Sequence, residues 1–339
     1  MSSVMVLGAN GRLGRALVLA FAAAGWQVLA QLRRAPRAPL PEGVRVVEAD
    51  ALDVAALAAA AAGQGVEVIV NALNPDYTKW ASLLPPQTAA VLTLARATGA
   101  TLMMAGNVYN FGNQLPPVLT ETTPFAATHP KAAQRIAQEA ALAQAAQATQ
   151  DHAPRCIVIR AGDFLGDAGT WIDLAMAKHL AQGRFAQMGP ADLPHAWAYL
   201  PDLARVFVQV AERRASLAPF TVLHHAGLTL TGADLQAGFE AGLGRPLRRT
   251  AFPWWALRLA SPVVPMFRAL LEMRYLWQRP HRLDDSRLRA LLGPVPATPL
   301  ADVVRQCIAG LPDVASPAAA SRHPPPRPQP VKTGTRRAG

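Results

Sequence analysis

The chain opens with short apolar stretches that alternate with segments of helical period. Apolar runs of strand length are found at 4–7, 28–32, 44–48, 66–70, 101–105 and 155–160. Between them, helical patterns cover 13–24, 53–62, 82–98 and 131–148. Strands that alternate with helices in this way are typical of parallel sheets with right-handed crossovers. The pattern therefore predicts an α/β protein with a doubly wound, Rossmann-type sheet built mainly from residues 1–165.

The pattern is less regular after residue 165. Helices are expected at 171–182 and 202–214, and one further strand at 221–224. Residues 232–311 have a mostly helical pattern that several prolines interrupt. We expect a smaller, mostly helical region over 166–312 that is interleaved with the first domain rather than separate from it.

Cysteine content and hydropathy limit where the chain can function. Cys156 and Cys307 are the only cysteines among 339 residues, which excludes a disulfide framework or a cysteine metal cluster. No uncharged apolar run is long enough for a transmembrane helix, and the first strand begins too early for a signal peptide. The sequence therefore predicts a cytoplasmic protein without a transmembrane segment or a metal.

The net charge of +11 is unevenly distributed. Five basic residues and no acidic residue follow Ala315, within a proline-rich segment that we expect to be a disordered tail over 313–339. A basic tail could contact nucleic acid or anionic lipid. No aromatic motif accompanies it, so no specific nucleic-acid partner is expected.

A glycine-rich turn follows the first strand directly, as Gly8-Ala9-Asn10-Gly11-Arg12-Leu13-Gly14, and leads into a helix. Such a turn leaves backbone N–H groups free at a helix N-terminus, where the helix dipole also favours an anion. The spacing is G-x-x-G-x-x-G rather than G-x-G-x-x-G, and an ordinary tight turn is the alternative. The turn predicts a pyrophosphate site formed by the amides of Gly8, Asn10, Gly11, Arg12 and Leu13, with Gly14 behind them.

The end of the second strand bears on the choice of cofactor. An acidic residue there would bind the ribose 2′-hydroxyl of NAD, but this chain has Leu32 followed by Arg33 and Arg34. A guanidinium can pair with a 2′-phosphate through two hydrogen bonds. We therefore expect Arg33 to favour NADP(H), with NAD(H) as the second possibility.

In their order along the chain, these motifs resemble those of extended short-chain dehydrogenases/reductases of the NAD-dependent epimerase/dehydratase family. The resemblance runs from residue 3 to about 300. It implies that the region over 166–312 lies on the substrate side. It also implies cofactor contacts from Asp50, Ala51 and Leu52 at the adenine and from Asn71, Ala72 and Leu73 after the fourth strand. The other landmarks are Asn107-Val108-Tyr109, Glu121-Thr122-Thr123-Pro124, the segment from Arg160 to Gly166, and Tyr199-Leu200-Pro201-Asp202.

The catalytic pattern of that family is missing. Where the family has Ser, Tyr and Lys, counting along the chain gives Ala105, Lys131 and Arg135. We take Lys131, Tyr109 and Asn107 as candidate catalytic residues. Lys131 would polarise the substrate or donate a proton. The alternative for Lys131 is a solvated row of charges with Arg135 and Glu139, and for Tyr109 a buried ring.

Three further features remain open. Tyr77 and Lys79 form a phenol–ammonium pair in sequence, and His195 beside Trp197 could face a substrate pocket. The aromatic stretch 252–267 is either an interfacial membrane element, a hydrophobic lid, or helices packed on the core or on the partner of a homodimer.

Two functions agree with these observations. The first is an NAD(P)-dependent oxidoreductase, epimerase or dehydratase that acts on a small metabolite through a non-standard site. The second is a catalytically inactive NADP(H)-binding sensor or assembly module, which the joint loss of Ser, Tyr and Lys favours.

Overall fold

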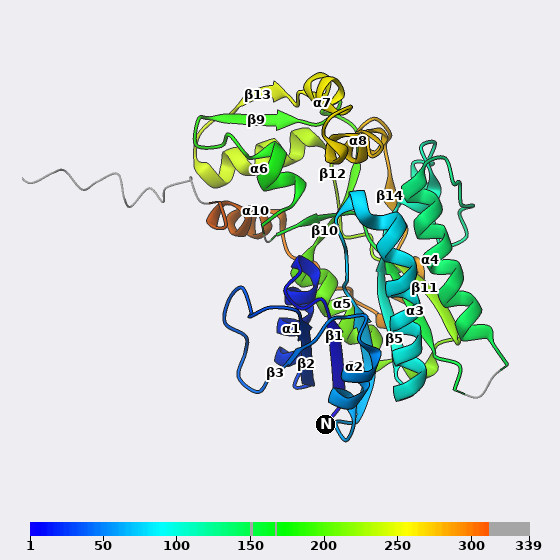
Figure 1. The fold of residues 1–339 in the computed structure, drawn as a ribbon. Helices are drawn as coiled ribbons and strands as arrows, with labels where there is room; N and C mark the ends of the chain where they lie inside the picture. Colours follow the sequence, from blue (N-terminus) through cyan, green and yellow to red (C-terminus); the bar gives the residue numbers. More distant parts are fainter. Residues whose placement is uncertain (150–151, 167, 312–339) are drawn as a thin grey trace, which may run out of the picture.

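The computed structural model describes residues 1–149, 152–166 and 168–311, so the expected tail over 313–339 lies outside the described residues. A seven-stranded sheet, in which every pairing is parallel, forms the centre of the molecule (Figure 1). The strand order is β11-β7-β5-β4-β1-β2-β3. From β1 the strand order continues to β2 and β3 on one side and to β4, β5 and β7 on the other, and a crevice for a ligand is expected at this switch point. The strands are β1 (Ser3–Leu7), β2 (Gln27–Leu32), β3 (Arg45–Glu48), β4 (Val66–Asn71), β5 (Thr101–Gly106), β7 (Cys156–Arg160) and β11 (Phe220–His224).

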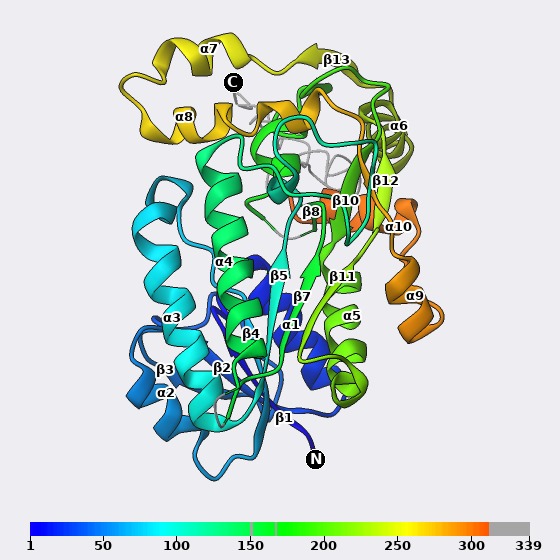
Figure 2. The same ribbon diagram turned by 90° about the vertical axis from the view of Figure 1, so that its right-hand side faces the viewer.

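Helices cover both faces of this sheet (Figure 2). Val4 and Val6 of β1 pack on one face with α1 and α5, whereas Met5 and Leu7 pack on the other with α2, α3 and α4. Alternate residues of a strand point to opposite faces, so a strand covered on both sides is apolar throughout. This arrangement confirms the doubly wound fold. The helices are α1 (Arg12–Ala23), α2 (Val54–Ala61), α3 (Trp80–Thr98), α4 (Pro130–Gln147) and α5 (Leu200–Glu212).

A second region lies beyond the carboxyl ends of the strands (Figure 1). Its core contains Phe185, Trp197, Phe239 and Trp277. The chain enters this region after β7 and returns to the main sheet for α5 and β11. The short strands outside the main sheet are β6 (Val118–Leu119), β8 (Asp163–Leu165), β9 (Arg184–Gln187), β10 (His195–Tyr199), β12 (Leu228–Leu230), β13 (Arg248–Ala251) and β14 (Arg282–Leu283). The helices that follow β11 are α6 (Gly232–Leu243), α7 (Trp254–Ala260), α8 (Pro265–Leu271), α9 (Ser286–Leu292) and α10 (Leu300–Ala309). Of these, α9 packs Leu288 and Leu292 into the core of the main sheet.

The prediction of a helix at 171–182 is wrong for most of that range. The structure has a five-residue π-helix, Ile172–Met176, and turns after it. Ala177 N–H donates to the carbonyl oxygen of Ile172 at 2.6 Å, one residue further back than in an α-helix. Ala177 and Leu180 are both buried in the second core, so tertiary packing sets the backbone here rather than the helical period.

In the described part of the chain, no helix is both long and apolar enough to cross a membrane. The same residues contain no group of three His, Cys, Asp or Glu side chains that could hold a metal ion.

Candidate functional site

The three glycines of the turn are packed so closely that a side chain at these positions would strain the backbone or clash with it. Gly8 has a φ of +79°, in the left-handed region that glycine adopts without strain. A Cβ on Gly14 would overlap the carbonyl oxygen of Gly8, because α1 begins directly against the turn. Gly11 N–H donates to that same oxygen at 2.8 Å. The turn thus presents bare backbone, which a diphosphate can approach closely.

The N-terminus of α1 has no side-chain cap. Its N-cap residue, Gly11, makes no capping hydrogen bond. By contrast, α2, α4 and α6 are capped by Asp53, His129 and Thr231. The first N–H groups of a helix have no acceptor inside the helix, and they lie at the positive end of its dipole. Two of the predicted amides, Gly8 N–H and Gly11 N–H, already donate to Gln31 Oε1 and to Gly8 O. The amides left to fit a pyrophosphate are those of Asn10, Arg12 and Leu13.

Two amide side chains shape the turn and the loop beside it. Gln31 accepts from Gly8 N–H at 2.9 Å through Oε1 and donates to Ala49 O at 2.6 Å through Nε2. Asn10 donates to the carbonyl oxygens of Arg34 and Ala35, at 3.1 Å each. It also accepts from the N–H of Arg37 at 3.1 Å. The sequence indicated only the backbone of Asn10, whereas its side chain holds the loop that contains Arg33 and Arg34.

The remaining cofactor candidates lie at the same edge of the sheet. Arg33 is exposed beyond β2. Asp50 is exposed beyond β3, where its Oδ1 accepts from Leu52 N–H at 2.9 Å. Asn71 ends β4, and its Oδ1 accepts from Leu73 N–H at 3.1 Å. The Arg12 side chain leaves the glycine turn and donates to the carbonyl of Gly169, which joins the turn to the loop after β8.

Two tyrosines meet beyond the ends of β4 and β5. The hydroxyls of Tyr77 and Tyr109 are 3.0 Å apart. Asn107 fixes the local turn by accepting from Tyr109 N–H at 3.0 Å. Burial raises the pKa of Tyr77 and raises that of Tyr109 well above its usual value, so both phenols stay protonated at neutral pH. Lys79 is exposed, and Tyr77 therefore pairs with Tyr109 rather than with Lys79.

The row of charges on α4 is buried, so the alternative of a solvated row is wrong. Lys131, Arg135 and Glu139 are all less than one-tenth exposed, and each has a different partner. Lys131 Nζ pairs with Glu272 at 2.8 Å and lies 5.8 Å from the centre of the Tyr77 ring. Arg135 donates to Gln138 at 2.8 Å, with its guanidinium 4.4 Å from the centre of Trp80. Helix α4 and the two short 3₁₀ helices that begin at Tyr77 and Tyr109 thus bring Lys131 and the two phenols together.

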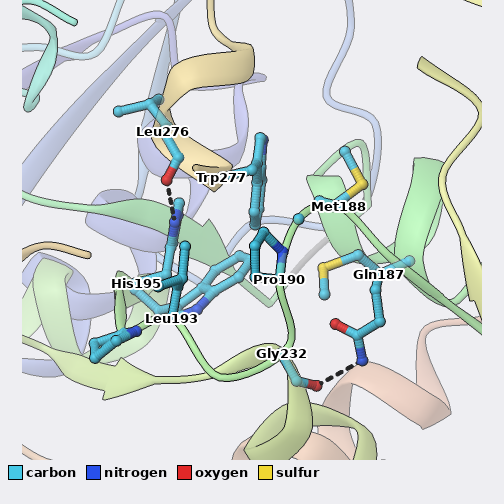
Figure 3. Close-up of a pocket in the computed structure, with 12 residues that line it drawn as sticks. Gln187, Met188, Pro190, Leu193, His195, Gly232, Leu276 and Trp277 are labelled. Atoms are coloured by element: carbon cyan, nitrogen blue, oxygen red, sulfur yellow. Dashed lines mark hydrogen bonds between the residues drawn. The ribbon is translucent and has the colours of Figure 1, made fainter. Parts of the chain in front are cut away.

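His195 is held through both ring nitrogens. Nε2 lies 2.9 Å from Asp163 Oδ2. Nδ1 lies 3.2 Å from Leu276 O (Figure 3). The ring stacks on Trp277, with centroids 4.3 Å apart and planes 5° from parallel. The cavity beside it, which Gln187 and Gly232 also line, has a volume of about 20 Å³, enough for one water molecule. The histidine is packed into the second core, with no room for a substrate at this cavity.

Comparison with known proteins agrees with this geometry. Residues 8–150 match the family model described as NAD(P)H-binding. The matched segment begins at the glycine turn and spans less than half of the chain. A 3-diazoavenalumate denitrifying reductase from a Streptomyces species is 38% identical over 133 residues, which are 36% of this chain and 43% of the relative. This chain therefore matches less than half the length of that curated relative.

Solved structures extend the likeness to nearly the whole fold. A UDP-glucose-4-epimerase from Stenotrophomonas maltophila, solved with NAD, has a TM-score of 0.70 at 16% identity, covering 91% of this chain and 98% of that one. A human epimerase family protein solved with NADPH has a TM-score of 0.66 at 19% identity, covering 91% and 100%. These matches confirm the fold that the resemblance to short-chain dehydrogenases/reductases implies.

Proposed function

We propose that this protein is an NADP(H)-dependent reductase of a small metabolite, with an active site that replaces the usual Ser, Tyr and Lys. The match of residues 8–150 to the NAD(P)H-binding family model supports the cofactor class. The exposed Arg33 supports the phosphorylated form, because no acidic residue ends β2 to hold a free 2′-hydroxyl. NAD(H) is the second choice. Two free cysteines support a cytoplasmic location.

The proposed cofactor contacts follow the edge of the sheet. The backbone of the glycine turn would hold the pyrophosphate, and Arg33 the 2′-phosphate. The segment after β3 would contact the adenine, and the segment after β4 would lie beside the bound cofactor. The residues concerned are Gly8, Asn10, Gly11, Arg12, Leu13, Gly14, Arg33, Asp50, Ala51, Leu52, Asn71, Ala72 and Leu73.

The Tyr77–Tyr109 pair is the observation that favours reduction over oxidation or epimerisation, and the proposal depends on it. Both phenols are protonated at neutral pH, and a protonated phenol can donate to a substrate oxygen or nitrogen that gains electrons. It is a poor base for removing a proton from a substrate hydroxyl, as oxidation or epimerisation requires. A bound reduced nicotinamide would supply the hydride. The named activity of the Streptomyces relative is also a reduction.

Lys131 and Asn107 complete the proposed site. The ammonium of Lys131 favours negative charge near the phenols, and burial beside Tyr77 strengthens this effect because little water screens it. Asn107 keeps Tyr109 in place through the Tyr109 N–H. In this proposal Tyr109 donates the proton, Tyr77 supports it by a hydrogen bond, and Lys131 polarises the substrate.

One observation favours the second function, a cofactor-binding sensor. Lys131 is already paired with Glu272, which neutralises the charge that catalysis would use. A sensor would bind the cofactor and use the same ion pair only to join its two regions.

The experiment separates the two functions. NADPH binding is measured by nicotinamide fluorescence, and oxidation of NADPH is followed with fractionated metabolite extracts. We expect Tyr109→Phe to keep the affinity for NADPH and to lose about 100-fold or more of the turnover. Tyr199→Phe is the matched control, because Tyr199 bonds to Gln306 of α10 and not to the other tyrosines. Tight binding without oxidation in any fraction would contradict the reductase and support the sensor.

The glycine turn needs its own test, because both functions depend on it. Gly14→Ala forces a Cβ into the Gly8 carbonyl and is expected to abolish NADPH binding. Gly310→Ala is the control, since a Cβ there meets its nearest neighbours at an ordinary 3.6 Å. Calorimetry that finds unchanged binding in Gly14→Ala would refute the assigned cofactor site.

A further inference from the structure

The most exposed apolar side chains of the second region gather on one helical hairpin, formed by α7, α8 and the turn between them. Trp255 and Leu259 of α7 are 70% and 73% exposed, and Val263 in the turn is 81% exposed. Trp255 and Leu259 are four residues apart and so lie on one face of the helix. Of the other large hydrophobic side chains among the described residues, only that of Met1 is more exposed than these three. Single exposed hydrophobic residues are common, but a contiguous group marks an interaction surface.

The hairpin is firmly attached to the body of the protein. The indole of Trp254 is buried, donates to Met188 O at 2.7 Å and packs against Phe252. At the other end, Glu272 follows α8 and pairs with Lys131 of α4. Figure 2 shows both helices at the outer end of the second region. The exposed face therefore belongs to an ordered element, so its exposure is part of the fold.

The charges on and beside the hairpin have one sign. Arg258 and Arg268 are exposed and are the only charged residues from 252 to 271. Arg248 and Arg249 of β13, which precedes the hairpin, are exposed as well. The next carboxylate, Glu272, is neutralised by Lys131. Two copies of such a face would repel each other, which argues against a self-contact. An anionic surface would attract the arginines.

We propose that the α7–α8 hairpin docks on the surface of an anionic lipid bilayer. Trp255, Leu259 and Val263 would enter the boundary between headgroups and acyl chains, and the arginines would pair with lipid phosphates or carboxylates. The hairpin lies in the interface and does not span the membrane, since its helices have only seven residues each. This docking is independent of the reductase activity proposed above.

The test is co-sedimentation of the full-length protein with phosphatidylcholine vesicles, with and without phosphatidylserine. We expect binding to the anionic vesicles only, and weaker binding at higher salt. Trp255→Glu and Leu259→Glu should each reduce the partition coefficient about tenfold or more, because each removes apolar burial and adds repulsion. Leu174→Glu is the matched control: Leu174 is 63% exposed but lies outside the hairpin. Thermal unfolding of each variant verifies that it is folded.

Three results would overturn the proposal. The first is unchanged vesicle binding by folded Trp255→Glu and Leu259→Glu. The second is binding that disappears only when the basic residues after Ala315 are replaced by glutamine, which would assign the lipid contact to the tail. The third is a dimer that these hairpin variants convert to monomer, without vesicle binding by the unmodified protein. The tail residues to replace are Arg322, Arg327, Lys332, Arg336 and Arg337.

Discussion

Lys131 near the start of α4 donates to Glu272 beyond the end of α8, across 2.8 Å in space and 141 residues in sequence. The side chain of Lys131 is 5% exposed and that of Glu272 is 26% exposed. The lysine lies on a helix that covers the main sheet, and the glutamate lies in the second region. The pair therefore fixes the proposed catalytic cation and also joins the hairpin to the site. A buried ion pair is weak evidence for stability by itself, so its role has to be found by substitution.

We expect Lys131→Ala to lower turnover about 100-fold or more while the dissociation constant for NADPH stays the same. Lys131→Arg should restore part of the activity, because it keeps the charge but not the shape of the ammonium. Lys79→Ala is the control, since Lys79 is exposed near the same tyrosine in sequence. Steady-state kinetics and fluorescence titration measure the two quantities. Full turnover in Lys131→Ala would remove the lysine from the proposed chemistry.

Cofactor choice gives a second prediction. Arg33→Ala should weaken NADPH binding about tenfold or more and leave NADH binding unchanged, because a hydrogen bond to a charged group is worth about 1.5–3 kcal/mol. Asn10→Ala should reduce the same preference, since it releases the carbonyls of Arg34 and Ala35. Arg45→Ala is the control, as Arg45 is an exposed arginine at the start of β3, away from the turn. The idea fails if the unmodified protein binds NADH more tightly than NADPH.

His224 predicts how stability depends on pH. Burial, and then the adjacent Arg160 guanidinium, lower the pKa of His224 to about 4. Nδ1 lies 3.1 Å from Leu119 O, and Nε2 lies 3.2 Å from Nη1 of Arg160, which suits a neutral ring. The unfolded chain binds this proton near pH 6.5, so falling pH favours unfolding. The neutral His224 ring therefore makes its full contribution to the free energy of unfolding above about pH 6.5. This contribution is lost as the pH falls toward about 4, a change of about 3 kcal/mol.

Urea unfolding at several pH values measures this change. The free energy of unfolding should fall between pH 6.5 and 4. His224→Gln should make that fall less steep, because about one proton fewer is taken up on unfolding. His179→Gln is the control, because His179 is exposed. An identical slope in His224→Gln and the unmodified protein would show that His224 does not titrate in this window.

The central fold could be predicted from sequence because its strands are buried on both faces and its helices on one. Asp53, for example, is the first residue of the helical pattern at 53–62, and its carboxylate caps α2 by accepting from Ala56 N–H at 3.0 Å. The short strands β8 and β12 have three residues each, too few for a periodic pattern.

Partners distant in sequence could not be predicted either. The spacing of Lys131, Arg135 and Glu139 indicated one helical stripe, but no local signal pointed to Glu272 or Arg160. Nor did the sequence show that Tyr77 would turn toward Tyr109, since that contact depends on how a loop folds over the sheet. The sequence shows directly that the usual Ser, Tyr and Lys are missing. It does not show which side chains contact the residues that replace them.

The pair of Glu139 and Arg160 gives the last prediction. Arg160 is 2% exposed, and its Nε and Nη2 reach the Glu139 carboxylate at 3.2 and 2.6 Å. Removing one partner leaves the other charge buried and unpaired, so Arg160→Met should reduce the free energy of unfolding by about 3–5 kcal/mol. Glu139→Gln combined with Arg160→Met should cost less than the sum of the single changes, because no lone charge remains. Arg305→Ala is the control, since its pair with Asp302 is exposed and worth less than about 1 kcal/mol. Arg160→Met should also raise the pKa of His224, because the cation that disfavours its protonation is gone. A variant as stable as the unmodified protein would show that water or another side chain satisfies Glu139.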